Sequence, residues 1–439
     1  MPRKKRTTDE VVEVVYERCC GMDIHKDNIT ACLNIGGKRE VKEYTTMTDD
    51  LLLLSNWLKE NEVEMVAMES TGSYWKPIFN IFEIQNIPAI LVNAQHVKTL
   101  SGCKTDKRDA KWISGLLRHG LLKPSFVPVR AQRELRELIK YRISLTEESV
   151  RVMNRMEKVL QGANIKLSSV ISKTGTKTEL AIIKALSEGI YDPRLLSEMA
   201  KGTLRAKKEE LIRSLNGLIE EHQRFLLKSM YNHLERLNAE IETVEGEIDK
   251  RMEADDEVLK RLEEIPGVGK TTAQAILAEI GTDMEQFPNE GHLASWAGIC
   301  PGQNESAGKR KSGKTRKGNS TLKKTLVQCA NSASRAKDSY LSAQHKRIAA
   351  RRGRKRANVA VAHSILIICY FIIKDGTTYE DLGGDYFDRR NKDRVIHRSI
   401  AKLESLGYDV ILKEKSEENQ TTFVIKEKPP DVSVDENVA

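Results

Sequence analysis

The first 125 residues contain short apolar segments and longer amphipathic ones. Short apolar runs, and a run that alternates between polar and apolar positions, indicate β-strands, whereas apolar residues three and four apart indicate helices. The predicted strands are Cys19–Ile24, Ile29–Ile35, Lys38–Tyr44, Glu64–Glu69 and Ala89–Asn93. The predicted helices are Leu51–Lys59, one from about Trp75, and Lys107–His119. This pattern predicts an α/β domain over residues 1–125.

The order of these elements restricts the topology of that domain. Three strands come before the first helix, and strands and helices alternate after it, which gives β-β-β-α-β-α-β-α. This is the order of an RNase H-like (RuvC-like) sheet, in which the first strand is central. We therefore expect functional side chains at the end of the first strand and at the end of a neighbouring one.

Residues 126–260 show a heptad pattern instead. One apolar stripe is interrupted by Arg142 and Ser149, and a second stripe has spacings of 3, 4, 3 and 4. The first contains Leu135, Leu138, Leu145, Val152, Met156 and Val159, and the second contains Leu234, Leu237, Ile241, Val244 and Ile248. Such repeats predict a coiled-coil connector with two long helical arms and a more irregular tip near residues 163–205. An internal antiparallel hairpin and a dimer interface both fit this pattern.

Residues 261–375 predict a mostly helical domain. A Pro- and Gly-containing turn, Ile265–Lys270, precedes a helix over Thr271–Ile280, and a polar loop over Gly302–Asn319 precedes helices over 320–375. The remainder, 376–439, predicts a helix at 394–406, a hairpin and a disordered acidic tail. The strands of that hairpin are Tyr408–Leu412 and Thr421–Ile425.

Positive charge is concentrated in one part of the chain. The 439 residues include 72 Lys+Arg and 63 Asp+Glu, a net charge of +9. The window Ser306–Arg356 holds 17 Lys+Arg and a single acid, Asp338. A density of this kind favours binding to the phosphates of nucleic acid, although a solvated basic face or a mobile loop has the same composition.

Other features exclude several classes of protein. Seven cysteines without a Cys-x-x-Cys pair argue against a disulfide framework or structural zinc and for a reducing cytosol. No run of 18 uncharged apolar residues occurs, so we expect no transmembrane helix and no membrane partner. The basic N-terminus is not followed by an apolar segment, which is unlike a secretory signal.

Four carboxylates lie at the ends of predicted elements. Asp23 ends the first strand, Glu69 ends the fourth, and Asp106 and Asp109 open the helix that follows the fifth. The spacing of Asp106 and Asp109 places both on one helical face. Converging carboxylates suit Mg²⁺ in phosphoryl transfer. Singly, each could be a turn, loop or capping residue, and we assign nearby His25 a supporting or structural role.

Two segments of the helical domain suit phosphate chemistry. Gly267, Gly269 and Lys270 belong to a turn that resembles a helix-hairpin-helix, where backbone N–H groups can approach a phosphate. A plain helix–helix turn is the alternative. Ser306 lies in a polar loop among cations, and a serine there can attack a phosphodiester if a base or metal activates it. The cations of that loop are Lys309, Arg310, Lys311, Lys314, Arg316 and Lys317.

Taken together, these motifs resemble the insertion-sequence-110 family of transposases. The segments are GMDIHK, MESTGSYW, KTDKRDA, IPGVGK, WAGICPGQNESAGK and KGNSTLKKTL, in that order over residues 20–375. The resemblance implies a RuvC-like domain, a coiled-coil connector and a C-terminal transposase domain. It implies Mg²⁺ held by Asp23, Glu69 and the Asp106–Asp109 pair, and a catalytic serine at Ser306. The segment Ser306-Ala307-Gly308 lacks the doubled serine or glycine of many members, and Ser312 and Ser320 lie nearby.

The resemblance also implies partners. These are donor and target DNA and a structured guide RNA, the bridge RNA, that pairs with both. We expect a homo-oligomer, a dimer or tetramer, in a nucleoid-associated cytoplasmic protein of a prokaryote. A site within one subunit and a composite site, with Ser306 from one subunit and the carboxylates from another, both fit the sequence. Two alternatives are a RuvC-like junction-resolving nuclease that uses water as the nucleophile, and a non-catalytic nucleic-acid scaffold.

Overall fold

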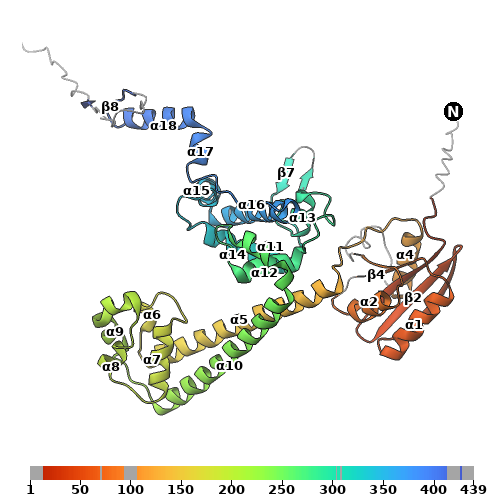
Figure 1. Ribbon diagram of the computed structural model, residues 1–439, viewed down its shortest axis with the longest axis horizontal. Helices are drawn as coiled ribbons and strands as arrows, with labels where there is room; N and C mark the ends of the chain where they lie inside the picture. The colour runs from red at the N-terminus through yellow and green to blue at the C-terminus, as the bar shows by residue number, and fades with distance from the viewer. Residues whose placement is uncertain are drawn as a thin grey trace, which may run out of the picture. The chain divides into compact units, whose positions relative to one another are not determined.

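The computed structural model describes residues 13–69, 72–92, 106–302, 304–306, 309–412 and 426–427. The chain divides into two compact units, Met1–Arg133 and Glu134–Ala439. Figure 1 shows a mixed sheet with helices in the first unit and a mostly helical second unit.

The first unit is built on a five-stranded mixed sheet in the order β3-β2-β1-β4-β5. β1 pairs antiparallel with β2 and parallel with β4, so it lies at the centre. The outer pairs are β2 with β3, antiparallel, and β4 with β5, parallel. The strands are β1 (Arg18–Ile24), β2 (Asn28–Ile35), β3 (Lys38–Thr45), β4 (Met65–Glu69) and β5 (Ala89–Val92). All five predicted strands are confirmed within one or two residues.

Helices cover both faces of this sheet (Figure 1). Successive side chains of a strand point to opposite faces, and the buried residues divide accordingly. Met22 and Met68 pack with α1 (Thr48–Glu60) and α2 (Trp75–Ile84). Cys19 and Ala67 pack instead with α4 (Asp106–Arg118). The face that α4 covers is the one that the odd-numbered residues of β1 and β4 share.

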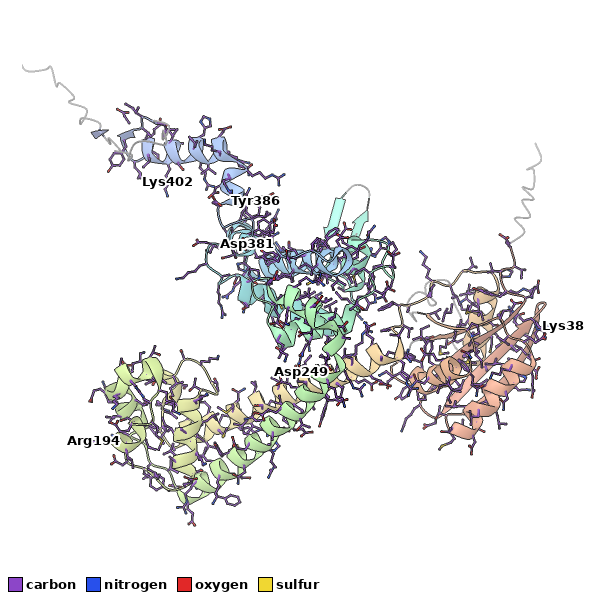
Figure 2. All side chains as sticks on the ribbon, viewed as in Figure 1. Lys38, Arg194, Asp249, Asp381, Tyr386 and Lys402 are labelled. Atoms are coloured by element: carbon purple, nitrogen blue, oxygen red, sulfur yellow. The ribbon has the colours of Figure 1, made fainter. Side chains whose placement is uncertain are left out.

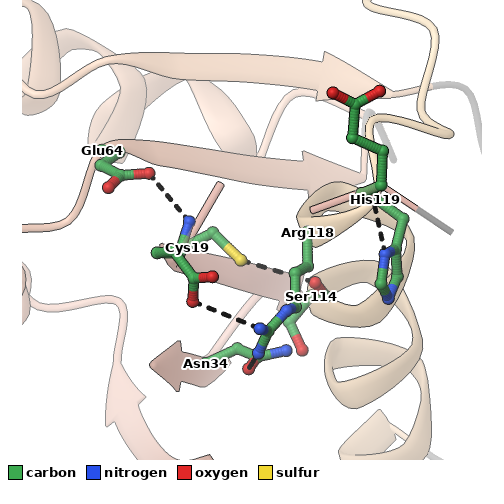
Figure 3. Close-up of polar contacts among 8 residues, drawn as sticks. Cys19, Asn34, Glu64, Ser114, Arg118 and His119 are labelled. Carbon is green, nitrogen blue, oxygen red and sulfur yellow. Dashed lines mark hydrogen bonds and ion pairs between the residues drawn. The ribbon is translucent and has the colours of Figure 1, made fainter. Parts of the chain in front are cut away.

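Close backbone contact fixes α4 against β1. A Cβ atom at Gly21 would lie 2.3 Å from the Ser114 backbone nitrogen and 2.5 Å from the Ala110 carbonyl oxygen. One turn further along α4, the Arg118 guanidinium lies 3.2 Å from Glu17. The Cys19 thiol donates to the Ser114 carbonyl oxygen at 3.6 Å (Figure 3), and burial raises the pKa of this thiol to about 11. Only glycine permits this approach of helix to strand.

We predict that Gly21→Ala destabilises the protein, whereas Gly115→Ala does not. A methyl group at Gly21 meets helix backbone, which we expect to lower the free energy of unfolding by about 1–3 kcal/mol. At Gly115 a Cβ atom would meet only the end of the Arg39 side chain, at 3.0 Å, and the gain in helix propensity is about 0.5–1 kcal/mol. Urea denaturation of both variants checks this, and equal losses would contradict it.

Two long helices, α5 (Arg130–Gly162) and α10 (Glu221–Arg251), form the arms of the second unit. Three cross-contacts show that they run antiparallel within one chain. Tyr141 donates to Glu240, His233 lies 3.5 Å from Glu148, and Arg251 lies 3.0 Å from Glu134. The predicted pairing of the two stripes therefore occurs internally, in a cluster with residues of both arms, among them Val152, Met156, Leu234 and Leu237.

The tip is more regular than expected. Four short helices and a 3₁₀ segment occupy it and share one buried core with the arms. They are α6 (Leu167–Val170), α7 (Lys177–Ser187), α8 (Pro193–Ser197), Gly202–Lys207 and α9 (Lys208–Leu215). The irregular tip of the sequence-based expectation is thus a small helical subdomain.

The interruption of the first heptad stripe has a structural reason. Arg142 is 4% exposed and donates to Gln274 at 2.7 Å and to the Thr271 carbonyl oxygen at 2.8 Å. Gln274 in turn donates to Asp249 at 2.7 Å; Asp249 is labelled in Figure 2. Arg142 therefore connects α5 and α10 to the helix α12 (Lys270–Ile280). An apolar residue at this position would contact only the two arms.

Beyond the arms the chain forms a helical domain around α16 (Arg354–Asp375), which packs against α11, α13, α14 and α15. Within the described residues, α16 is the one helix long and apolar enough to span a membrane by length and composition. A helix at the core of a helical domain passes the same test. The other helices are α11 (Asp256–Glu263), α12 (Lys270–Ile280), α13 (Glu290–Trp296), α14 (Ser320–Ala333) and α15 (Tyr340–Arg352).

Two details of the second unit differ from expectation. The predicted polar loop contains an antiparallel hairpin, β6 (Asn304–Ser306) with β7 (Lys309–Ser312). Near the C-terminus, α17 (Tyr386–Arg389) and α18 (Lys392–Glu404) precede β8 (Tyr408–Asp409), which pairs with β9 (Lys426–Glu427). The predicted partner strand 421–425 and the acidic tail lie outside the described residues.

Candidate functional site

Asp23 and Glu69 lie side by side at one end of the sheet. The parallel register pairs Met22 with Met68, so the next residues along the two strands are Asp23 and Glu69. By alternation both side chains belong to the face that α4 covers. They are 6% and 8% exposed, and neighbouring strands are about 4.8 Å apart. Two carboxylates are thus held close together in a poorly solvated position.

The start of α4 lies at the same end of the sheet. Cys19 contacts Ser114, and Gly21 contacts Ala110 as well as Ser114, so α4 runs opposite to β1. Two residues along a strand and four along a helix cover nearly equal distances, about 6–7 Å. Asp23 is therefore level with the first turn of α4, where the backbone of Asp106 and Asp109 begins the helix. The backbone positions of all four predicted acidic residues are therefore at this end of the first unit.

His25 provides one contact to this group of acids. The His25 imidazole lies 3.3 Å from Asp23, and half of the histidine side chain is exposed. The side chain of Asp106 lies outside the described residues. Among the side chains that the structure describes, no three His, Cys, Asp or Glu residues are grouped closely enough to hold a metal ion. The donors are nevertheless carboxylate oxygens, which suit a hard divalent cation.

Ser306 ends β6 and pairs with Lys309, the first residue of β7. Glu305 pairs with Arg310, and the register shifts between Asn304 and Glu305. The side chains of this hairpin lie outside the described residues, as do residues 307 and 308. Its backbone nonetheless places Ser306 and the first cations, Lys309 and Arg310, at the same end of the ribbon.

The base of this hairpin is tightly held. The Gly302 N–H donates to the Lys314 carbonyl oxygen at 2.8 Å. A Cβ atom at Gly318 would lie 2.4 Å from the Gly298 nitrogen, so these two segments of the chain are in backbone contact. The Lys323 ammonium donates to the Gly298 carbonyl oxygen at 3.0 Å and to Thr315 at 2.6 Å. These contacts tie both ends of the hairpin to α14.

The cations of this region lie largely in solvent. Lys314, Arg316 and Lys317 are exposed, and Arg316 lines a pocket of about 290 Å³ with Ser295, Cys300 and Pro301. Basic residues at the α15–α16 junction are exposed as well: Lys346, Arg347, Arg351, Arg352, Arg354, Lys355 and Arg356. The basic window is therefore a surface feature of the second unit.

The Ile265–Lys270 turn is already occupied by contacts within the chain. Gly267 has a φ of +88°, and its Cβ would lie 2.4 Å from the Cys329 carbonyl oxygen of α14. The Gly269 N–H donates to the Thr272 hydroxyl at 2.9 Å. The Lys270 ammonium lies 2.8 Å from Asp249, which raises the pKa of the lysine and lowers that of the aspartate. Gly267 thus allows the turn to pack closely against α14.

We predict that Gly267→Ala lowers the free energy of unfolding by at least about 1–3 kcal/mol, because the methyl group collides with α14 and the backbone is left-handed. Gly269 has a φ of −111° and open space around it, so Gly269→Ala should cost less than about 1 kcal/mol. Urea unfolding measures both variants. An unchanged Gly267→Ala protein would contradict the packing role.

Three residues that the sequence did not single out organise the hairpin base: Arg136, Glu279 and Asn319. Glu279 is 1% exposed and accepts from the Asn319 amide at 2.6 Å. Arg136, on α5, lies 3.2 Å from the same carboxylate. A signal was present in the sequence, because Glu279 is an acid in the apolar run Ala275–Ile280.

Comparisons with known proteins agree with this architecture. A DEDD transposase model of IS110 matches residues 20–165, which include the four acids and all of the sheet except the first two residues of β1. A model described as "Transposase IS116/IS110/IS902 family" matches residues 259–346, which include the hairpin. A protein with these two domains is a transposase. The chain belongs to the IS110 family of transposases.

Individual relatives support the assignment over most of the chain. The transposase of insertion sequence element IS1111A from Coxiella burnetii is 26% identical over 394 residues, 86% of this chain and 94% of the relative. An IS110 protein from Streptomyces coelicolor is 24% identical over 298 residues, covering 63% and 72%. The IS1328 transposase from Yersinia enterocolitica is 32% identical over 126 residues, covering 27% and 37%.

Proposed function

We propose that this transposase cuts and rejoins DNA through a covalent phosphoserine intermediate at Ser306. In the cutting step the Ser306 oxygen forms a bond to the scissile phosphorus while the bond from phosphorus to the 3′ oxygen breaks. The serine proton is lost, the 3′ oxygen gains one, and a 5′ phosphate stays on the protein. Rejoining reverses the step with a different 3′ hydroxyl, so no ATP is needed.

The observation that carries the proposal is the position of the acids. Asp23 and Glu69 follow the last paired row of two central strands, on the face where α4 begins with Asp106 and Asp109. Like charges in a poorly solvated place repel unless a cation compensates them. We infer that these four residues hold Mg²⁺, which when bound would stabilise the charge on the attacking and leaving oxygens. The strand order β3-β2-β1-β4-β5 with a central β1 supports a RuvC-like domain.

The hairpin and its surroundings supply the remaining parts. The backbone pairs Ser306 with Lys309 and Glu305 with Arg310. We assign to these two cations the stabilisation of the phosphorane charge. Exposed Lys314, Arg316 and Lys317 extend the basic surface along the hairpin base. We assign this surface to DNA backbone phosphates, and through the family resemblance we expect a bridge RNA to select the sites.

A hydrolytic nuclease is the second candidate. The acids all belong to Met1–Arg133, whereas Ser306 belongs to the other compact unit. A RuvC-like sheet can activate water with its carboxylates alone, in which case the hairpin only binds DNA. The two functions differ in one product, because hydrolysis leaves no protein–DNA adduct.

The test uses protein co-expressed with the non-coding flanks of its element, so that a guide RNA can copurify. Mg²⁺ and end-labelled donor and target DNA are added, and a denaturing gel separates free DNA from covalent adducts. We expect an adduct that is absent in Ser306→Ala and in Asp106→Ala. Cleaved DNA without an adduct, undiminished in Ser306→Ala, would instead establish the hydrolytic nuclease.

A further inference from the structure

We propose that Arg136, Glu279 and Asn319, together called the support cluster, position the Ser306 hairpin for attack. None of them belongs to the acids or to the hairpin itself. The inference rests on the proposed role of Ser306 as the nucleophile. In this proposal the support cluster orients Ser306 and does not bind DNA.

Glu279 is the centre of the cluster. It lies in the last turn of α12, and one carboxylate oxygen, Oε2, receives both partners: Arg136 at 3.2 Å and Asn319 at 2.6 Å. The other oxygen, Oε1, is buried and has no hydrogen-bond partner within the described part of the chain. A buried carboxylate that keeps one oxygen unsatisfied is costly for stability alone, which favours a role in function.

Asn319 connects this carboxylate to the hairpin. Its Oδ1 accepts from the Leu322 N–H at 3.0 Å and so caps α14, while its Nδ2 donates to Glu279. Its own N–H donates to the Trp296 carbonyl oxygen at 3.3 Å. The preceding residue is Gly318, in backbone contact with Gly298. The side-chain amide of Asn319 thus fixes the point where the segment after β7 joins α14.

Arg136 connects the same carboxylate to the arm. Its guanidinium donates to the Ala278 carbonyl oxygen at 3.0 Å and to that of Glu279, the last carbonyls of α12. It also lies 5.8 Å from the Trp296 ring. Burial lowers the pKa of Arg136 and the Glu279 charge opposes that shift. Removal of the Glu279 charge therefore takes away a negative charge that compensates the largely buried Arg136 guanidinium.

These contacts predict that only one of the two bonds to Glu279 affects the chemistry. The Arg136–Glu279 charge pair holds α5 against α12, so its loss should affect unfolding. The Asn319–Glu279 hydrogen bond reaches the hairpin, so its loss should affect the orientation of Ser306. Displacing a reacting group by about 1 Å can slow a reaction about a hundredfold.

Two variants separate these effects. Asn319→Ser keeps a good N-cap for α14 but cannot donate to Glu279. Glu279→Gln keeps an acceptor for Asn319 but removes the charge beside Arg136. We measure the rate of adduct formation in a single turnover at saturating DNA, the Kd for the same DNA, and Tm, on the protein–RNA complex with Mg²⁺.

We expect Asn319→Ser to form adduct at least about tenfold more slowly, with Kd unchanged and Tm lowered, because the buried Glu279 carboxylate loses a hydrogen bond. Glu279→Gln should also lower Tm but keep the adduct rate of the folded fraction within about threefold, a change small on the scale of misplaced reacting groups. An equal loss of rate in both variants, or an Asn319→Ser protein whose folded fraction reacts at the wild-type rate, would overturn the inference. Ser306→Ala is assayed alongside, because an adduct that survives there refutes the proposed function instead.

Discussion

Ser306→Ala is expected to abolish covalent adduct formation and recombination, with a loss of at least about 10⁴-fold, because removal of a nucleophile leaves only binding and electrostatic effects. The substitution removes one oxygen from the end of β6 and leaves the backbone pairing with Lys309 unchanged. DNA and RNA affinity should therefore stay within about threefold of the wild type, since phosphate contacts come from Lys and Arg. A denaturing gel for adducts and a filter-binding assay measure the two quantities.

Ser312 and Ser320 provide matched controls. Ser312 lies on β7 of the same hairpin, and Ser320 is the first residue of α14. Ser312→Ala and Ser320→Ala should retain adduct formation. If one of them loses it while Ser306→Ala keeps it, the nucleophile is assigned to the wrong serine, although the mechanism stands.

Asp23→Asn and Glu69→Gln are expected to reduce adduct formation by at least about 10³-fold, a loss typical of removing an essential charge at a phosphoryl-transfer site. The same variants should not lose stability without metal. Neutralising one of two buried neighbouring carboxylates removes a repulsion, so Tm should stay constant or rise in EDTA.

Metal dependence of Tm tests the site without any activity assay. A ligand that binds the folded state alone stabilises it in proportion to RT ln(1 + [L]/Kd), so Mg²⁺ at 100 times its Kd adds about 2.7 kcal/mol. The wild type should therefore gain Tm with Mg²⁺, and Asp23→Asn and Glu69→Gln should not. Glu62→Gln is the control, because Glu62 lies 3.5 Å from Arg18, at the opposite end of β1 from Asp23. An equal gain in all proteins would show that the four acids are not the metal site.

The sequence predicted the elements of the first unit well, because period-two alternation and apolar runs reflect burial in a sheet directly. It also placed Asp23 and Glu69 at strand ends. It could not establish that these two strands are neighbours, since the parallel pairing of β1 with β4 forms across an intervening hairpin and helix. The adjacency of the two acids is therefore a tertiary result.

The second unit shows where local pattern was insufficient. The segment Lys309–Ser312 has three cations in a row and low strand propensity, yet it forms β7, because the contacts of Gly298, Gly318 and Lys323 bring the two chains of the hairpin base together. In the sequence, Arg142 only interrupts a heptad stripe. Its partners, Gln274 and Thr271, are about 130 residues away along the chain.

The sequence by itself predicted most of the elements, the basic window and a set of candidate site residues, since propensity, charge and hydrophobic period are local properties. It also determined membership of the IS110 family, because ordered motifs survive where overall identity is low. The tertiary structure alone decided three other features: the shared row of Asp23 and Glu69, the pairing of the arms within one chain, and the cluster of Arg136, Glu279 and Asn319. Each of these features depends on contacts between segments that are distant in the sequence. The free energy of such contacts comes from packing and buried hydrogen bonds, whose two partners do not occur together in any short stretch of sequence.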